Sequence, residues 1–477
     1  MPPLAADDDA LDEQQAAQLG RLLEVHVEAR ELGERFAAAS HELYLVGGTV
    51  RDALLSAEAR PDLDFATSAL PAQTEEILRG WADHVWDIGA RFGTISAQKD
   101  GRLVEVTTYR SDQYTPGSRH PEVTFGDSIE GDLARRDFTV NAMAVRVPDF
   151  RFVDPSGGLQ DLAKGLLRTP IEPAESFAAD PLRIMRLARF AAVLDADPDP
   201  ATEAAASAMA ESIRAVSAER VRDELNKLVV GVAAAKGLDV LIRTGVAAQV
   251  VPEVAALPAC VDPEQRHKDV YAHTLAVVAN CEPEPILRLA ALFHDVGKPD
   301  TRRIHRDRTV TFHHHEAVGA RLTRERMRAL RYDKQTVDDV TDLVFMHLRF
   351  HTYRMGWTDS AVRRYVRDAG HLLDRLNELT RADVTTANPS KAQRIRRRMD
   401  ELEERITELR EQEELEAMRP AIDGNQIMAH LGIDPGPLVG EAWNHLLELR
   451  IEHGPMSEED ALAALDEWWR ERAPEVS

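Results

Sequence analysis

The stretch LYLVGGTVRDALL at residues 43–55, with DLDFAT at residues 62–67, decides the fold of the first part of the chain. Its opening apolar run predicts a short buried strand, Gly47-Gly48 predicts a tight turn, and TVRDALL predicts the start of a helix. Paired glycines let a backbone approach a ligand closely and point its amide N–H groups at phosphate. The stretch therefore favours a phosphate-binding turn, with a glycine turn that binds nothing as the alternative.

Two carboxylates share one strand face in DLDFAT. Side chains alternate along a strand, so Asp62 and Asp64 point to one side. Leu63 and Phe65 point to the other side and enter the core. Adjacent carboxylates repel each other unless a cation lies between them, and oxygen ligands of this kind suit Mg²⁺, which commonly binds one or two carboxylates plus substrate phosphates. A solvent-facing strand edge is the alternative for this motif alone.

A third carboxylate follows in a predicted hairpin. The Asp100-Gly101 pair predicts a turn between strands at residues 94–99 and 102–110. Alternation in the second strand places Glu105 on the face opposite its valine neighbours. With the two aspartates it predicts a cluster for two metal ions, one activating an attacking hydroxyl and the other stabilising the leaving oxygen.

An arginine stripe marks the helix predicted for DPLRIMRLARFAAVL at residues 180–194, with the proline at its first position and Asp180 as its N-cap. Arg183, Arg186 and Arg189 recur every three residues and lie along one stripe. Because an unpaired buried charge is costly, these arginines must meet anions or hydrogen-bond acceptors. Internal salt bridges are the structural alternative.

Six imidazole and carboxylate groups fall on successive predicted helices further along. PILRLAALFHDVGKPDT at residues 285–301 predicts an apolar helix stopped by Gly297 and Pro299, with a His-Asp pair near its end. A lone histidine is more often a core or surface residue, but this combination suits Mn²⁺, Fe²⁺, Ni²⁺, Zn²⁺ or Mg²⁺. We predict a metal site, and prefer His315 to the two histidines before it. The six candidates are His273, His294, Asp295, His315, His347 and Asp383.

Composition limits the classes of protein that the chain can belong to. Its 477 residues suffice for two to four domains. The two cysteines, Cys260 and Cys281, indicate buried thiols in a reducing cytoplasm. There is no 18-residue apolar run to span a membrane and no signal peptide. The net charge of -24 argues against nonspecific nucleic-acid binding, so any such contact requires a local basic face.

The pattern along the chain predicts an α+β head and then a long helical body. Residues 1–20 look disordered or weakly helical, residues 21–38 helical, residues 42–170 rich in short strands, and the rest helical in period. The charged run at residues 391–417 predicts a solvated amphipathic helix. Its apolar stripe is Met399, Leu402, Ile406 and Leu409. The alternative is a basic cluster on RNA backbone, formed by Arg394, Arg396, Arg397 and Arg398.

Several motifs in order resemble the class II tRNA nucleotidyltransferase and poly(A) polymerase family, part of the polymerase-beta superfamily. They are the two stretches quoted first, VEVTTYRSDQYTPGSRHPEVTF at residues 104–125, DLARRDFTVNAMAV at residues 132–145 and DPSGGLQDLAKGLLRT at residues 154–169. The histidines and aspartates from His273 to Asp383 resemble the metal ligands of the HD phosphohydrolase superfamily. The similarity to HD domains fused to bacterial nucleotidyltransferases, closest to the actinobacterial type, is close. The resemblance covers essentially residues 42–470.

The resemblance implies a fold and a domain order. The fold class is α+β: a polymerase-beta-like head with a small mixed β-sheet, then an all-α neck and body and an all-α HD domain. The implied division is an N-terminal helical extension at 1–38, the head at 39–170, the neck at 171–258, the HD domain at 259–388 and a helical tail at 389–477.

The resemblance also implies an activity, namely transfer of CMP and AMP from CTP and ATP to the 3′ end of tRNA. Catalysis with Mg²⁺ would use Asp62, Asp64 and Glu105, the last helping to deprotonate the 3′ hydroxyl. Asp180 and Arg183 would read the base, although the family's preceding glutamate is Ala179 here. The implied nucleotide-binding set is Gly47, Gly48, Arg51, Arg136, Asp137, Asn141, Asp180, Arg183, Arg186 and Arg189. The helix predicted at residues 219–231 would brace the base-reading helix through Arg220, Glu224 and Lys227.

For the HD part, the resemblance implies one metal on His273, His294, Asp295 and Asp383, and a second on His315 and His347. Mn²⁺, Ni²⁺ or Mg²⁺ would serve, and the activity would be hydrolysis of phosphate esters at RNA ends, including 2′,3′-cyclic phosphates. A relic that only folds around a metal is the alternative.

Two other functions compete with CCA addition. A poly(A) polymerase shares all the transferase motifs, but IDGNQIMAHLGIDPGPLVGEAW at residues 422–443 looks like the tail of bacterial CCA-adding enzymes. The other is an HD phosphohydrolase whose transferase head has become an RNA-binding module. The sequence leaves the oligomeric state open.

Overall fold

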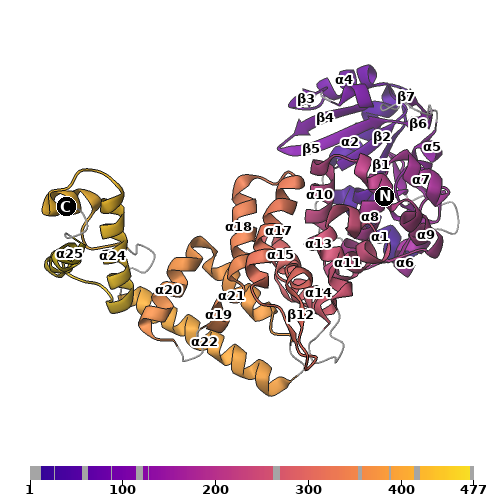
Figure 1. Cartoon of the computed structure of the whole chain (residues 1–477). Helices are drawn as coiled ribbons and strands as arrows, with labels where there is room; N and C mark the ends of the chain where they lie inside the picture. The colour runs from indigo at the N-terminus through magenta and orange to yellow at the C-terminus, as the bar shows by residue number, and fades with distance from the viewer. Residues whose placement is uncertain are drawn as a thin grey trace. The chain divides into compact units, whose positions relative to one another are not determined.

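The computed structural model describes residues 12–25, 27–55, 63–87, 89–113, 122–126, 128–260, 269–352, 357–385, 388–412 and 419–472. The chain forms two compact units, Met1–Pro252 and Glu253–Ser477 (Figure 1). Among the described helices, none has the length and apolar character to cross a bilayer. The five-part division implied by the sequence stays a prediction.

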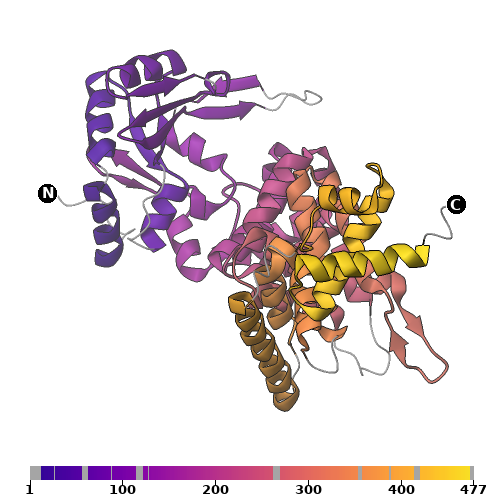
Figure 2. The ribbon, with the colours of Figure 1, turned by 90° about the vertical axis from the view of Figure 1, so that its left-hand side faces the viewer.

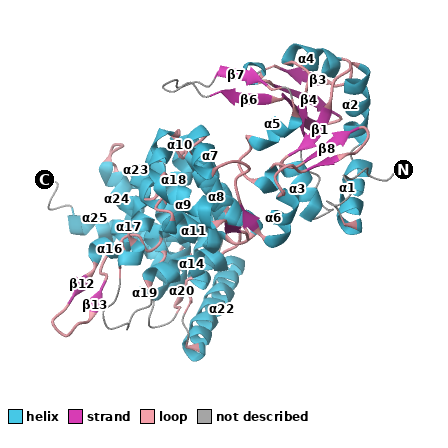
Figure 3. Cartoon of the chain, turned by 90° about the vertical axis from the view of Figure 1, so that its right-hand side faces the viewer, coloured by secondary structure: helices cyan, strands magenta, loops and turns pink. Residues whose placement is uncertain are grey.

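A seven-stranded mixed sheet forms the centre of the first unit, in the order β3-β4-β5-β2-β1-β8-β9 (Figure 3). Within its described strands, β2 and β5 pair in parallel and the other neighbours are antiparallel. This confirms the predicted small mixed sheet. Its strands are β1 (Leu43–Val46), β2 (Leu63–Thr67), β3 (His84–Trp86), β4 (Thr94–Lys99), β5 (Arg102–Thr108), β8 (Ala144–Val147) and β9 (Phe152–Val153).

The strand, turn and helix predicted from the opening stretch are present. All four residues of β1 are buried, and helix α3 (Gly48–Leu55) follows directly after Gly47. Gly47 has a φ of +68°, a left-handed conformation that L side chains seldom adopt. A Cβ there would also lie 2.8 Å from Nη1 of Arg136. The turn therefore requires glycine both for its backbone and for the approach of an arginine.

Strand register places the predicted carboxylates. In β2, Leu63 and Phe65 are buried and Asp64 is exposed, as the alternation predicts. Asp62 lies outside the described residues. Asp64 is the parallel partner of Glu105 in β5, so the two side chains share one sheet face. The hairpin between β4 and β5 turns at Asp100 and Gly101, whose φ angles of +50° and +79° fit a type I′ turn.

The main core of the first unit lies on the opposite face of this sheet. Helices α1 (Glu13–Val25), α2 (Val27–Ala38), α3 and α4 (Pro71–Arg79) contribute side chains to it. Leu19 and Phe36, from the first two helices, are fully buried there. Burying a side chain of this size stabilises the fold by about 1.5–3 kcal/mol relative to leaving it exposed. The other face carries a second, smaller cluster that includes Ala66, Ile129 and Leu133, but Asp64 and Glu105 remain exposed there.

Helices follow the sheet in the first unit. The arginine helix, α8 (Leu182–Leu194), starts one residue later than predicted, with Pro181 as its N-cap. The reason is a tight first turn, in which the Arg183 N–H donates to the carbonyl of Asp180 at 3.0 Å. The Asp180 carboxylate still accepts the N–H of Leu182 at 3.1 Å. The other helices are α5 (Ile129–Ala134), α6 (Gly158–Lys164), α7 (Pro173–Ala179), α9 (Pro200–Ala208), α10 (Ala218–Val229), α11 (Ala234–Arg243) and α12 (Ala247–Val250). Short strand pairs join β6 (Arg110–Gln113) to β7 (Glu122–Phe125) and β10 (Leu166–Leu167) to β11 (Asp197–Pro198).

In its described residues, the second unit is helical apart from one small hairpin, formed by β12 (Arg303–Ile304) and β13 (Val310–Thr311) (Figure 2). The helix predicted to stop at Gly297 and Pro299 is α15 (Pro285–Phe293), and a second short helix, α16 (Lys298–Thr301), follows it. Pro299 lies in the first turn of α16, a position that proline fits because its missing N–H has no partner to lose there. The other helices are α13 (Pro252–Ala255), α14 (Val270–Asn280), α17 (His315–Ala329), α18 (Lys334–Met346), α19 (Arg349–Thr352), α20 (Asp359–Ala369), α21 (Leu373–Ala382), α22 (Pro389–Gln412), α23 (Gly424–Leu431), α24 (Pro437–His453) and α25 (Glu458–Arg472).

The charged helix α22 is amphipathic, as predicted. Met399, Leu402, Ile406 and Leu409 are all buried. Arg397 is exposed and pairs with Glu401 one turn later at 3.0 Å. The solvated amphipathic helix is therefore confirmed for the described part of the run.

Gly297 fixes the approach of the α15–α16 turn to α17. A Cβ on Gly297 would lie 2.1 Å from the carbonyl oxygen of His315 and 2.6 Å from the N atom of Gly319. A Cβ on Gly319 would be 3.3 Å from the N atom of Gly297, which a small shift can relieve. The close contact thus depends on the first glycine far more than on the second.

We predict that Gly297→Ala lowers the free energy of unfolding of the second unit by at least the ~1–3 kcal/mol typical of overpacking, because backbone must move. Gly319→Ala, the matched variant, should cost clearly less. Urea titration of both full-length variants, followed by circular dichroism, measures the difference. Equal stability of the two variants would contradict the close approach.

Candidate active site and metal centre

A cavity of about 880 Å³ opens in the first unit. It lies between the Gly47 turn, the RRDF segment (residues 135–138) and helix α8. All ten residues of the predicted nucleotide-binding set line it, and so does Asp64. Sequence reasoning did not assign Arg110, Arg135 or Phe190 to the set, although they line the cavity too. Their neighbours gave the signal: Arg135 precedes the assigned Arg136, and Phe190 is one helical turn beyond Arg186.

The cavity is cationic in a chain of net charge -24. Its described lining includes eight Lys or Arg side chains and three carboxylates. Its volume lies in the range of small-molecule sites, roughly 300–1,000 Å³. A surplus of positive charge in a concave site attracts and concentrates an anionic ligand. The cavity therefore has the size and charge to receive a nucleoside triphosphate.

A buried network orients the phosphate-facing groups. Arg51 donates from Nη1 to Oδ1 of Asn141 at 2.5 Å, and Asn141 donates from Nδ2 to Oδ1 of Asp137 at 3.0 Å. Arg186 pairs with the other oxygen of Asp137 at 2.7 Å. Burial acts to raise the pKa of Asp137, but Arg186 and the Asn141 hydrogen bond hold it below its ordinary value. Asp137 is therefore an ionised anchor that fixes two arginine-bearing elements.

The base-reading candidates Asp180 and Arg183 are held by groups that lie outside the stretch at residues 180–194. Asp180 accepts from Arg220 of α10 at 3.0 Å. Arg183 donates from Nη1 to the hydroxyl of Ser176 at 2.8 Å and from Nη2 to the carbonyl of Arg135. These contacts orient the guanidinium in a chain whose residue 179 is alanine, so the missing glutamate does not leave Arg183 unsupported. Burial lowers the pKa of Arg183.

Helix α10 braces α8 at a second point. Arg189 is buried and pairs with Glu224 at 3.0 Å, and burial lowers its pKa to about 10, which leaves it charged at neutral pH. The guanidinium stacks on Phe190, 3.9 Å from the ring centroid. Arg51 and Arg186 lie 5.4 and 5.6 Å from the same ring. The internal ion pairs considered as an alternative thus exist at Arg186 and Arg189, and the same side chains also line the cavity.

The strand carboxylates lie beside this cavity. Asp64 lines it, whereas Glu105 is absent from the described lining and accepts a hydrogen bond from Ser96 at 3.3 Å. Asp64 and Glu105 present carboxylate oxygens on one exposed sheet face. This oxygen donor set fits Mg²⁺, which binds carboxylates and substrate phosphates together.

The ion pair between Arg189 and Glu224, by which α10 braces α8, leads to a stability prediction. Glu224→Gln keeps a hydrogen-bond acceptor but leaves Arg189 without its counter-charge, so unfolding should become easier by about 3 kcal/mol, the lower end for breaking a buried pair. Affinity for CTP should fall as well, because α8 loses its support. Asp223→Asn, which changes the exposed neighbouring carboxylate, is the control. Urea unfolding and calorimetric titration with CTP measure both effects; a variant matching the control would show that Glu224 is not a brace.

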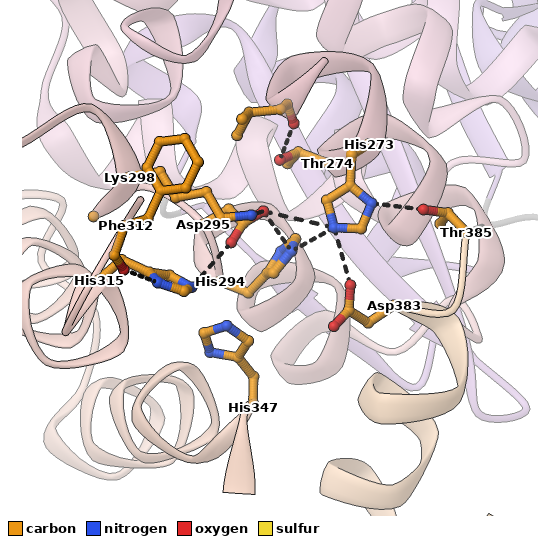
Figure 4. Close-up of polar contacts among 12 residues, drawn as sticks. His273, Thr274, His294, Asp295, Lys298, Phe312, His315, His347, Asp383 and Thr385 are labelled. Carbon is orange, nitrogen blue, oxygen red and sulfur yellow. Dashed lines mark hydrogen bonds and ion pairs between the residues drawn. The ribbon is translucent and has the colours of Figure 1, made fainter. Parts of the chain in front are cut away.

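A second site lies in the second unit, where the six predicted imidazole and carboxylate groups meet (Figure 4). They form two trios whose ligand atoms lie within 4.8 Å of one another: His273, His294 and Asp383, and Asp295, His315 and His347. Nε2 of His273 lies 2.9 Å from Asp383 and 3.3 Å from Nε2 of His294.

Asp295 lies between the trios. One carboxylate oxygen is 3.2 Å from Nε2 of His294, and the other is 3.5 Å from Nε2 of His315. Of the three consecutive histidines, His315 is buried at this cluster, whereas His313 and His314 are exposed. The geometry groups Asp295 with His315 and His347 and also brings it to His294, so it can bridge two ions.

Hydrogen bonds present the Nε2 atoms to a common centre. Nδ1 of His294, His315 and His347 is bonded to the carbonyl three residues earlier in each case, at 2.7, 2.7 and 2.6 Å. His273 is held through Nδ1 by Thr385 at 2.7 Å (Figure 4). Such bonds fix the tautomer and orientation of metal-binding imidazoles.

The donor set fits a divalent metal. Nε2 of His315 is buried without a hydrogen-bond partner among the described residues. Burial lowers the pKa of His347 to about 3, so its imidazole is neutral, which is the form that binds metal. Burial acts to raise the pKa of Asp295, but the neighbouring His294 and Lys298 hold it well below the ordinary value. Imidazole nitrogens and ionised carboxylates together suit Mn²⁺, Ni²⁺ or related ions.

Neighbouring histidines provide a matched test of this centre. His315→Ala should weaken binding of Mn²⁺ or Ni²⁺ by at least about tenfold, because one ligand is lost. His314→Ala, whose side chain is 85% exposed, should bind like the unaltered protein. Metal content after dialysis, measured by mass spectrometry, reports the result; equal retention by both variants would remove His315 from the site.

Comparison with known proteins finds matches in both units. Three family models match: "Poly A polymerase head domain" at residues 43–168, "Probable RNA and SrmB- binding site of polymerase A" at residues 197–257, and "HD domain" at residues 270–406. An A-adding tRNA nucleotidyltransferase of Deinococcus radiodurans is 34% identical over 368 residues, covering 74% of this chain and 82% of the relative. A CCA-adding enzyme of Levilactobacillus brevis is 39% identical over 48% of this chain, and the match spans 56% of that relative.

Solved structures show the same fold. The CCA-adding enzyme of Bacillus stearothermophilus in complex with CTP matches with a TM-score of 0.66 and 26% identity, over 94% of this chain and 99% of the other. That of Thermotoga maritima complexed with tRNA matches with a TM-score of 0.58 at 17% identity, over 96% of each chain, a likeness of fold.

A cationic cavity of nucleotide size beside carboxylates on a mixed sheet defines a nucleotidyltransferase head. The chain belongs to the tRNA nucleotidyltransferase and poly(A) polymerase family and carries an HD domain in its second unit. The resemblance stated from the sequence motifs is confirmed.

Proposed function

We propose that this protein adds CMP and AMP, taken from CTP and ATP, to the 3′ end of tRNA in the cytoplasm. The observation that carries the proposal is the single cavity in which Asp64, the Gly47 turn and the pair Asp180–Arg183 meet. Carboxylate, phosphate-binding and base-reading groups in one space are what a polymerase without a nucleic-acid template requires. The comparison with CCA-adding enzymes over nearly the whole fold supports it.

The 3′ oxygen of the RNA bonds to the α-phosphorus while the bond to the β-phosphate oxygen breaks and pyrophosphate leaves. Glu105 lies on the face where it can take the hydroxyl proton. Mg²⁺ held by Asp62, Asp64 and Glu105 would supply positive charge at the reacting oxygens. Arg51 and Arg136, with the N–H groups at Gly47-Gly48, bind the triphosphate.

Base choice follows from donor and acceptor chemistry. Cytosine and adenine each carry an exocyclic amino donor beside a ring-nitrogen acceptor, whereas uracil and guanine carry a carbonyl there. A carboxylate only accepts and a guanidinium only donates. Asp180 and Arg183, fixed by Arg220 and Ser176, therefore complement C and A and reject U and G.

Addition of A alone is the second candidate. The Deinococcus relative named for A addition matches over 74% of this chain, more than the 48% matched by the Levilactobacillus CCA-adding enzyme. Both activities would use the same cavity and carboxylates, so the requirement for CTP decides between them.

For the second unit we propose hydrolysis of phosphate esters at RNA ends with Mn²⁺, Ni²⁺ or Mg²⁺. The observation that supports it is the cluster of six ligands, with imidazoles fixed through Nδ1. In the reaction, water oxygen bonds to phosphorus, and the ester oxygen leaves with a proton.

The decisive experiment incubates the protein with Mg²⁺ and tRNA lacking CCA, with CTP, ATP or both. We expect three added nucleotides only with both triphosphates. Addition of A to tRNA already ending in CC, but never of C, would establish the A-adding candidate, and long A tails would indicate a poly(A) polymerase.

Asp64→Asn should lower turnover at least about 10³-fold, in the range for loss of a preorganised charge, with tRNA binding retained. Glu76→Gln on α4 is the control; near-normal turnover of Asp64→Asn would overturn the carboxylate assignment.

A further inference from the structure

A basic hairpin protrudes from the second unit between two parts of its metal centre. The segment TRRIHRDRTVT at residues 301–311 carries four arginines, one histidine and one carboxylate. In Figure 3 strands β12 and β13 extend away from the helices of their unit. Arg303, Arg306 and Arg308 are all exposed. This density of positive charge contrasts with a chain whose net charge is -24.

The hairpin is held in one shape by its own contacts. The His305 N–H donates to the carbonyl of Thr309 at 2.9 Å, and Nε2 of His305 is 3.0 Å from the hydroxyl of Thr311. Asp307 accepts from both the backbone N–H and the hydroxyl of Thr309, at 3.1 and 2.7 Å. The one carboxylate of the segment thus holds the turn. Val310 is buried and fixes one strand to the unit.

Both ends of the hairpin are attached to the metal centre. On one side, α16 begins with Lys298, whose Nζ lies 2.6 Å from Asp295 and over the ring of Phe312 at 5.7 Å. On the other side, the carbonyl of Phe312 anchors Nδ1 of His315. The close contact of Gly297 with His315 joins the two sides at the base. A polymer bound along the hairpin would therefore have one end close to the metal centre.

We propose that this hairpin is an RNA-binding arm, in which Arg303 and Arg306 contact the phosphate backbone of an RNA whose terminal phosphate ester lies at the HD centre. The inference rests on the proposed hydrolase function of that centre. Exposed arginines on a two-stranded ribbon bind phosphates irrespective of the base sequence. Arg303 lies in β12 and Arg306 in the turn closed by the bond from the His305 N–H to the Thr309 carbonyl, so the two side chains leave different parts of the hairpin and can contact separate phosphates.

The test compares two substrates of the full-length protein loaded with Mn²⁺ or Ni²⁺, with no nucleoside triphosphate present. One is a short RNA ending in a 2′,3′-cyclic phosphate, and the other is bis(p-nitrophenyl) phosphate, which has no backbone to bind. For the double variant Arg303→Ser, Arg306→Ser, we expect KM for the RNA to rise about tenfold. The slope of log KM for the RNA against log salt concentration should decrease by roughly 0.7 for each lost phosphate contact. Turnover of the small ester should be unchanged.

The matched control is Arg321→Ser, Arg328→Ser, which removes the same charge from the exposed face of α17. Equal losses in both double variants, or an unchanged KM in the hairpin variant, would overturn the arm. A second readout is photo-crosslinking of RNA containing 4-thiouridine, mapped by mass spectrometry without added metal. Crosslinks within residues 302–311 support the arm even if neither ester is hydrolysed, a result that would reject only the hydrolase function. Crosslinks that avoid this segment overturn the arm.

Discussion

Buried arginines need counter-charges, and the first unit is built around that requirement. Helix α8 buries Arg183 and Arg189, and removing such charges from water without partners would cost more than the fold can supply. Glu224 of α10 provides the counter-charge for Arg189, and Asp137 pairs with the neighbouring Arg186. Arg183 is held by the Ser176 hydroxyl and the Arg135 carbonyl. The same ion pairs connect the segment after α5, helix α8 and helix α10 around a single cavity. A positive cavity can therefore exist in a strongly acidic chain.

Sheet register supplies the second constraint. Since β2 and β5 run parallel with Asp64 opposite Glu105, the two carboxylates share the sheet face opposite the main core, where both remain exposed. The second unit solves a similar problem with helices. Four imidazoles are fixed through Nδ1, so their Nε2 atoms converge, and Asp295 lies between the two trios. In both sites, backbone geometry holds side chains together: carboxylates that would otherwise repel each other in the first, and imidazoles and carboxylates in the second.

Much of the site could be predicted because its motifs are local. A glycine pair after an apolar run, an alternating strand and an arginine every third residue each follow from the periodicity of one element. Helix ends were less predictable: Pro299 lies in the first turn of a second helix, and α8 begins at Leu182. Arg110 was not assigned because nothing in its immediate sequence distinguishes a cavity wall from a surface position.

The sequence by itself determined the family, the order of elements and the residue types that carry the chemistry, because these depend on local pattern and on motifs in register. Only the tertiary structure decided that Ser176 and the Arg135 carbonyl hold Arg183 in place of an absent glutamate, and that His315 rather than its neighbours enters the metal centre. Those outcomes depend on contacts between residues far apart in the chain or on the direction in which a helix begins. Long-range packing fixes both, and local sequence does not specify it.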